Sequence, residues 1–202
     1  NRIECYNPLT SENLIKMSQK VTEVTKDILP DQKIDCVVYG CTSGTIAAGH
    51  NSIEQKIKLA KPETKVTTPS TAAIKALKKL KIQKLFIFTP YSKRLNDEVV
   101  EYFKKENFNV TSNSYFDIET DIDIGKVDQN YLYEVLSKID LKDADALFVS
   151  CTALPVLSII DKLEKKLNKP VLSSNQALIW DTLENIGKNN SVHGFGKLFL
   201  AN

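Results

Sequence analysis

Two cysteines, Cys41 and Cys151, are the residues in this sequence whose type and position are most typical of catalytic groups. Each closes a short apolar run and is followed at once by threonine, in Tyr-Gly-Cys-Thr-Ser-Gly (39–44) and Ser-Cys-Thr-Ala (150–153). A thiol between a strand end and a helix start lies near backbone N–H groups and the positive end of the helix dipole, which stabilise its thiolate. The pattern therefore indicates two thiols that can act as nucleophile, acid or base.

The two cysteine segments resemble each other. Asp35 to Thr42 and Asp145 to Thr152 each contain an aspartate, an apolar run, a small residue and then Cys-Thr. The cysteines are 110 residues apart, about the length of one small α/β unit. A free cysteine is usually a small buried hydrophobe, and either thiol alone could be that. Two matching contexts favour function, because units related by a pseudo-twofold would bring both strand ends to a shared cleft.

Short apolar runs alternate with amphipathic stretches along the whole chain. Strands are expected at 34–39, 65–67, 85–89, 108–115, 146–150 and 171–172. Helices are expected at 11–28, 42–60, 69–80, 93–106, 129–138, 153–167 and 174–185, with one helical turn in the acidic loop 117–128. This alternation predicts an α/β fold with parallel sheets and helices on both faces. Ligands of such sheets bind outside the carboxyl ends of the strands, where both cysteines fall.

Composition excludes several classes of function. The 202 residues include 27 basic and 25 acidic side chains, and the lysines are scattered over helices as on a solvated face, not gathered as in a nucleic-acid site. The longest uncharged run, Ala146 to Ile160, is too short to span a bilayer. Four unevenly spaced cysteines give neither a disulfide framework nor metal-site spacing. With no signal peptide at its start, we expect a cytoplasmic chain with no nucleic-acid, membrane or metal partner.

Five segments together resemble the aspartate/glutamate racemase superfamily, in its branch of maleate cis–trans isomerase, arylmalonate decarboxylase and EutA-like proteins. They are residues 39–45, 68–72, 89–91, 150–154 and 170–180. The resemblance implies two flavodoxin-like parallel-sheet domains related by a pseudo-twofold, with the active site in the cleft between them. The first domain would hold residues 1–80 and 173–202, and the second 81–172. The same resemblance implies that the protein needs no cofactor, acts on a small carboxylate or amino-acid substrate, and forms a homo-oligomer.

The resemblance also assigns roles to residues. Cys41 and Cys151 would be catalytic: racemases use such a pair to move a proton between faces of the substrate, and in maleate isomerase the first cysteine adds to a double bond. Substrate oxygens would be bound by hydroxyls, those of Thr42, Ser43, Thr152 and Tyr91. We therefore expect a cofactor-independent isomerase or racemase of a small carboxylate or amino acid.

Two departures keep other functions open. Asp121 stands where maleate isomerases carry an asparagine in a mid-chain loop, and its carboxylate would repel a second anion. Family members begin with a strand and a Pro-Ser-x-Asn loop, whereas this chain opens at Asn1-Arg2-Ile3, so one wall of the site would be missing unless further chain precedes it. A non-catalytic metabolite-binding protein is one alternative, and an arylmalonate-type decarboxylase, which works with the second cysteine alone, is another. A redox thiol protein is disfavoured, because no resolving cysteine adjoins either motif.

Two further polar residues receive structural interpretations. His50 follows the first cysteine motif closely, and a place on a helix surface is favoured over proton transfer. Asn175 begins the last helix, where helix capping and domain packing are favoured over substrate contact.

Overall fold

The computed structural model describes residues 1–188 and 191–201. Its strands are β1 (Cys36–Val38), β2 (Lys65–Thr67), β3 (Lys84–Thr89), β4 (Asn109–Tyr115), β5 (Ala146–Val149) and β6 (Val171–Ser173). Its α-helices are α1 (Ser11–Ser18), α2 (Val21–Lys26), α3 (Thr42–Ala48), α4 (His50–Ala60), α5 (Pro69–Lys79), α6 (Lys93–Lys105), α7 (Asp121–Gly125), α8 (Gln129–Leu136), α9 (Ile160–Leu167) and α10 (Ser174–Asn185). Two 3-10 helices complete the elements, η1 (Leu157–Ile159) and η2 (Lys197–Leu200).

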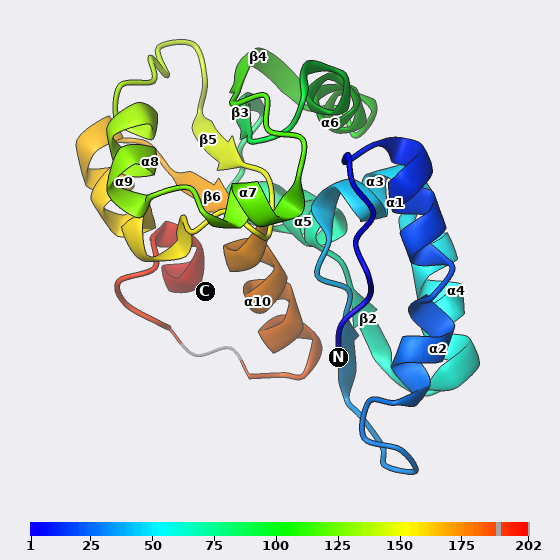
Figure 1. Ribbon diagram of the computed structural model, residues 1–202. Helices are drawn as coiled ribbons and strands as arrows, with labels where there is room; N and C mark the ends of the chain where they lie inside the picture. Colours follow the sequence, from blue (N-terminus) through cyan, green and yellow to red (C-terminus); the bar gives the residue numbers. More distant parts are fainter. Residues whose placement is uncertain (189–190, 202) are drawn as a thin grey trace.

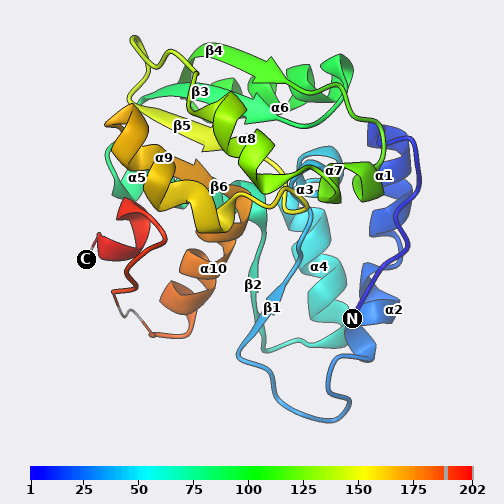
Figure 2. The same ribbon diagram turned by 60° about the vertical axis from the view of Figure 1, so that its left-hand side comes forward.

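The strands form two parallel sheets, so the predicted α/β fold with parallel sheets is confirmed. The larger sheet has the order β4-β3-β5-β6, and β1 pairs with β2 in the smaller one. Figures 1 and 2 show the larger sheet with helices on both faces, and the β1-β2 pair beside α2 and α4. The division of the chain at residues 80 and 173 stays a prediction.

The larger sheet has a topological switch point at its centre. The chain leaves β3 for β4 on one side and then returns to place β5 on the other side of β3. Ligands of parallel sheets bind at such a point, outside the carboxyl ends of the two strands. The segments that follow these strands carry Tyr91 and Cys151, so the fold alone marks this edge as a site.

Three predicted helices are divided or shortened in the structure. The helix expected at 42–60 breaks into α3 and α4 at Gly49, whose φ of 81° lies in the left-handed region that glycine adopts readily. The helix expected at 153–167 begins only with η1 and α9, since the residues after Cys151 form turns that enclose the thiol. The helix expected at 11–28 divides into α1 and α2.

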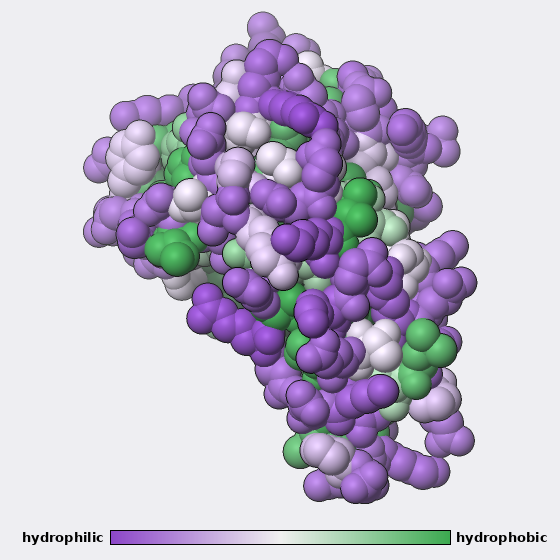
Figure 3. Space-filling model, turned by 45° about the vertical axis from the view of Figure 1, so that its right-hand side comes forward, coloured by the Kyte–Doolittle hydropathy of each residue, from purple (hydrophilic) through white to green (hydrophobic). Residues whose placement is uncertain are grey.

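Apolar side chains from both sheets form one continuous core. β3 and β5 are almost entirely buried, and Phe88, Phe103 and Phe148 are among its largest enclosed side chains. Burial of aromatic and branched side chains at about 25 cal/mol per Å² is the main term that fixes these strands in place. The face shown in Figure 3 is mainly hydrophilic, with hydrophobic residues scattered over it. No helix among the described residues is long and apolar enough to cross a membrane.

Candidate active site

Cys41 lies at the carboxyl end of β1, as the N-cap residue of α3. Its Sγ accepts a hydrogen bond from the Gly44 N–H at 3.3 Å and lies 3.9 Å from the Ser43 hydroxyl. Burial raises the pKa of the Cys41 thiol to about 12, the Gly44 N–H opposes that rise, and the nearby Cys151 adds to it. The thiol is therefore protonated at neutral pH in the unliganded protein.

Cys151 lies at the carboxyl end of β5 and is 4% exposed. Its φ of 121° is a conformation that residues other than glycine rarely adopt, at a cost of about 1–3 kcal/mol. Two hydrogen bonds keep Cys151 in this conformation. The Cys151 N–H donates to Ser174 Oγ at 3.1 Å, and the Ala153 N–H donates to Cys151 Sγ at 3.3 Å. Such local strain persists at functional sites when the neighbouring structure fixes it.

The Tyr91 side chain interacts electrostatically with both thiols. Its side chain is 2% exposed. Burial raises the pKa of Cys151 to about 11, and a hydrogen bond from Tyr91 opposes that rise. Burial also raises the pKa of Tyr91 itself, with both thiols adding to the shift and Ser43 opposing it. The structure thus brings Cys41, Cys151, Tyr91 and Ser43 into one cluster, of which all but Cys41 are buried.

Two hydrogen-bond links join the cysteine corners. The Thr152 hydroxyl donates to the Gly40 carbonyl at 2.7 Å, directly from the second corner to the first. The Thr42 hydroxyl donates at 2.9 Å to Ser174 Oγ, the same atom that accepts from the Cys151 N–H. Ser174 therefore connects both corners from the first residue of α10, and sequence reasoning did not single it out. Its sequence signals are its place directly after β6, at another strand end, and its position within the resembling segment 170–180.

A pocket of about 510 Å³ opens beside Cys41. Cys41, Thr152, Asn175 and Asp121 line it, together with Asn1, Arg2, Ile3 and several apolar side chains. Asp121 is half-buried at the start of α7, and its charge raises the pKa values of Cys5 and Cys151. Of the predicted site residues, Cys41, Thr152 and Asp121 thus face open space, whereas Cys151, Thr42, Ser43 and Tyr91 lie buried behind it.

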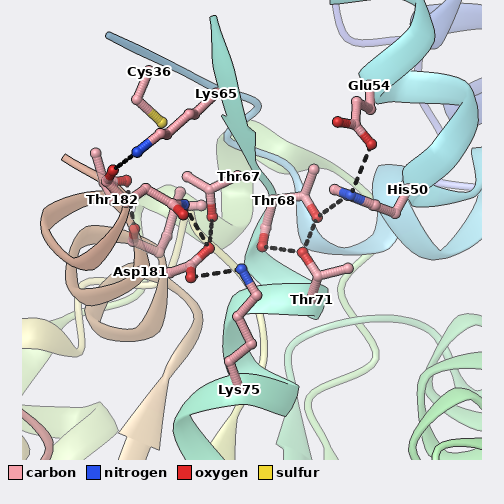
Figure 4. A network of polar contacts seen from close by, with 12 residues as sticks. Cys36, His50, Glu54, Lys65, Thr67, Thr68, Thr71, Lys75, Asp181 and Thr182 are labelled. Carbon is pink, nitrogen blue, oxygen red and sulfur yellow. Dashed lines mark hydrogen bonds and ion pairs between the residues drawn. The ribbon is translucent and has the colours of Figure 1, made fainter. Parts of the chain in front are cut away.

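The remaining polar candidates have other partners. Asn175 does not cap α10, because Ser173 does so with a capping box; the Asn175 amide donates to the Thr152 carbonyl at 2.9 Å. Figure 4 shows His50 between Thr68, 3.2 Å from its Nδ1, and Glu54, 3.6 Å from its Nε2. Among the described residues, no group of three or more histidine, cysteine or acidic side chains is arranged to hold a metal ion.

The fold and the two linked corners define an α/β protein with paired thiols at the strand ends. A sequence profile of the arylmalonate decarboxylase family matches residues 9–199. The chain belongs to this family, which confirms the resemblance inferred from its motifs.

Relatives with known activities match over most of the chain. A maleate isomerase of Geobacillus stearothermophilus is 26% identical over 198 residues, 94% of this chain and 78% of the relative. A structure of a maleate isomerase variant from Pseudomonas putida S16 with maleate superposes with a TM-score of 0.91 at 22% identity, covering all of this chain and 83% of the other. A mutant of the Nocardia farcinica maleate cis–trans isomerase with a covalently bound succinylcysteine intermediate gives 0.90 at 20% identity, covering 98% and 84%. At these identities the superpositions show the shared fold.

Proposed function

We propose that this chain is a cofactor-independent isomerase of a small unsaturated carboxylate, of the maleate cis–trans isomerase type, with Cys41 as nucleophile and Cys151 as acid and base. The observation that carries the proposal is the pair of links between the corners, Thr152 to Gly40 and Thr42 through Ser174 to Cys151. They place the two cysteine corners next to each other, with Cys41 at the pocket and Cys151 buried behind it. Relatives that are maleate isomerases, one of them with a succinylcysteine intermediate, support this chemistry.

The reaction needs no group beyond these residues. Cys41 loses its proton to solvent, and its thiolate adds to one alkene carbon, so that a C–S bond forms as the π bond breaks. The Cys151 S–H protonates the other carbon and gives a saturated adduct whose C–C bond rotates freely. The Cys151 thiolate then takes a proton back, the double bond re-forms and the C–S bond breaks. The released Cys41 thiolate regains a proton from solvent, so both thiols return to their first state and only the geometry of the substrate has changed.

Carboxylate binding would fall to groups that are not bonded from one corner to the other. The hydroxyl protons of Thr42 and Thr152 already bond to Ser174 and Gly40. We therefore assign the substrate oxygens to backbone N–H groups at the two corners and to the Ser43 and Tyr91 hydroxyls, which would exchange their bonds to the thiols for bonds to the substrate, with Asp121 at the rim of the pocket. Preorganised donors of this kind stabilise charge that develops in the transition state.

The test is proton NMR of maleate and related small dicarboxylates in deuterated water. We expect conversion to the trans isomer with solvent deuterium entering the product, and loss of at least about 10³-fold in rate for Cys41→Ser and Cys151→Ser. The matched control is Cys36→Ser, because Cys36 lies in β1 and has no place in the cluster. If the parent chain neither converts nor exchanges any substrate in the panel, the proposal fails.

A non-catalytic metabolite-binding protein is the second candidate, and one observation favours it. Burial raises both thiol pKa values well above neutrality, to about 12 and about 11, so the thiolate is the minor form of each in the unliganded protein. Saturable binding of a carboxylate by calorimetry with no exchange in the NMR assay would establish this candidate. An arylmalonate-type decarboxylase needs only the second cysteine, and for that activity Cys41→Ser would stay active.

We further propose a reducing, cytoplasmic location and a homo-oligomer. All four cysteines are free, which suits a compartment that keeps thiols reduced. Sedimentation equilibrium would determine the oligomeric state.

A further inference from the structure

Tyr39 ends the apolar run of β1, two residues before Cys41. Its N–H donates to the Thr67 carbonyl at 3.1 Å, which continues the β1-β2 ladder by one residue. The residue is only 7% exposed, so its phenol ring lies in the core while its hydroxyl reaches the base of α3. Figure 1 shows this corner where the chain passes from β1 into α3.

The Tyr39 hydroxyl has no hydrogen-bond partner among the described residues. A buried hydroxyl without a partner costs about 1–3 kcal/mol, and such groups in native proteins call for an explanation. The hydroxyl oxygen lies 2.8 Å from the position that a Cβ would take at Gly44, and Cys41 Sγ lies 2.9 Å from the same point. The free donor and the proposed nucleophile therefore border the same small space.

The two protonation states of Cys41 differ in what they offer this hydroxyl. Burial raises the pKa of Tyr39, and Cys41 adds to the rise, so the phenol stays protonated and acts as a donor. A neutral thiol is a poor acceptor, whereas a thiolate accepts strong, charge-assisted bonds. The hydroxyl thus gains a partner only when the thiol ionises.

We propose that Tyr39 is a positioning residue. After the Cys41 thiol has lost its proton to solvent, the Tyr39 hydroxyl donates a hydrogen bond to the Cys41 sulfur and so favours the thiolate. It joins the Gly44 N–H and the Ser43 hydroxyl, which act in the same direction. The thiols of Cys151 and Cys5 oppose them. The proposal rests on the nucleophilic role assigned to Cys41, but its test requires no substrate.

The test compares alkylation of Cys41 by iodoacetamide, followed by peptide mass spectrometry from pH 7 to 10, in the parent chain and in Tyr39→Phe. Because only the thiolate reacts, the rate at a fixed pH reports the thiolate fraction. We expect Tyr39→Phe to slow Cys41 at pH 8 by about tenfold or more, the effect of one lost bond to a charged group. The alkylation rate of Cys151 in the same sample should stay unchanged.

Three controls separate this role from a structural one. Tyr39→Phe removes an unpartnered buried hydroxyl, so its thermal midpoint should equal or exceed that of the parent. Tyr102→Phe removes another partly buried phenol, whose hydroxyl contacts Ser70, and should leave the Cys41 rate unchanged. Gly44→Ala places a methyl group against both atoms and should also slow Cys41.

Equal rates for Cys41 in the parent and Tyr39→Phe would overturn the proposal, and so would an equal fall for both thiols. Neither result depends on isomerase activity. A chain that fails the NMR assay but shows the selective loss keeps the Tyr39 proposal and loses the proposed function.

Discussion

At the scale of single residues, the two thiols rest in the protonated state. Burial raises both pKa values, and the opposing N–H and hydroxyl donors reduce that rise without cancelling it. A site of this kind becomes reactive when a substrate brings its own reactive carbon to the sulfur and the donors are already in place. Each group that shifts a thiol pKa therefore affects the reaction rate, and Asp121 is an acidic one that lines the open pocket.

Asp121→Asn should make Cys151 more reactive. The carboxylate raises the pKa of Cys151 by repulsion, so a neutral amide should lower that pKa and speed its alkylation at pH 8 by up to about threefold. The same change should lower the Kd for dicarboxylates, measured by calorimetry, because a like charge leaves the pocket. Asp123→Asn is the matched control, since Asp123 lies on the same helix and already pairs with Thr120 and Lys126. An equal response to both substitutions would contradict the assignment of Asp121 to the site.

At the scale of elements, α10 holds the site together from outside both sheets. Its first residue, Ser174, accepts bonds from both cysteine corners. Further along the helix, the buried Asp181 bonds to Thr67 at the end of β2 and, at 2.8 Å, to Lys75 on α5, as Figure 4 shows. One helix thus anchors the strand ends of the smaller sheet and the Cys151 corner of the larger one.

Replacing each of two neighbouring serines, Ser173 and Ser174, by alanine should affect stability in both variants but the reaction rate in only one. Ser173→Ala removes a helix cap and should cost about 1 kcal/mol in the free energy of unfolding while leaving the rate per folded molecule unchanged. Ser174→Ala should lower the free energy of unfolding by about 1–3 kcal/mol. It should also lower the rate per folded molecule at least about tenfold, because Thr42 and the Cys151 N–H lose their shared partner. Urea unfolding and the NMR assay measure the two effects. Equal losses of rate in both variants would remove Ser174 from its linking role.

At the scale of the whole molecule, folding buries ionisable groups that are neutral at physiological pH. The folded pKa values of Cys41 and Cys151 are about 12 and about 11, above the ordinary value of 9.0. Between these values the native state holds more protons than the unfolded state, so stability falls as the pH rises. Below about pH 9 both states are protonated and the thiols cause no dependence on pH.

The double variant Cys41→Ser/Cys151→Ser should therefore lose stability less steeply than the parent from about pH 9 upward. Urea unfolding at pH 7 to 10.5 measures the free energy of unfolding of both proteins. The difference in the free energy of unfolding between the parent and the double variant should be constant below pH 8.5 and should become smaller above it. Parallel curves over the whole range would show that the thiols are not desolvated in the native state.

Local patterns predicted much of this fold because the signals were local. Alternating apolar runs and amphipathic stretches placed all six strands, and Ser174 to Asn185 was predicted with the bounds that the structure gives. The helix breaks at Gly49 and after Cys151 were missed, since the first depends on one residue with positive φ and the second on packing around a buried thiol. Helix propensity gives only a weak signal at both places, through Gly49 and Pro155, which are poor helix formers.

The sequence by itself determined which residues stand at the strand ends: two Cys-Thr corners in matching contexts, recognisable because a strand, a turn and a helix start each leave a local pattern. Only the tertiary structure decided what those residues do for one another. It bonded the Thr42 and Thr152 hydroxyls to Ser174 and Gly40, and within residues 1–188 and 191–201 it gave the Tyr39 hydroxyl beside Cys41 no hydrogen-bond partner. Hydrogen-bond partners separated by more than 100 residues are set by how sheets and helices pack, and no spacing along the chain records that packing.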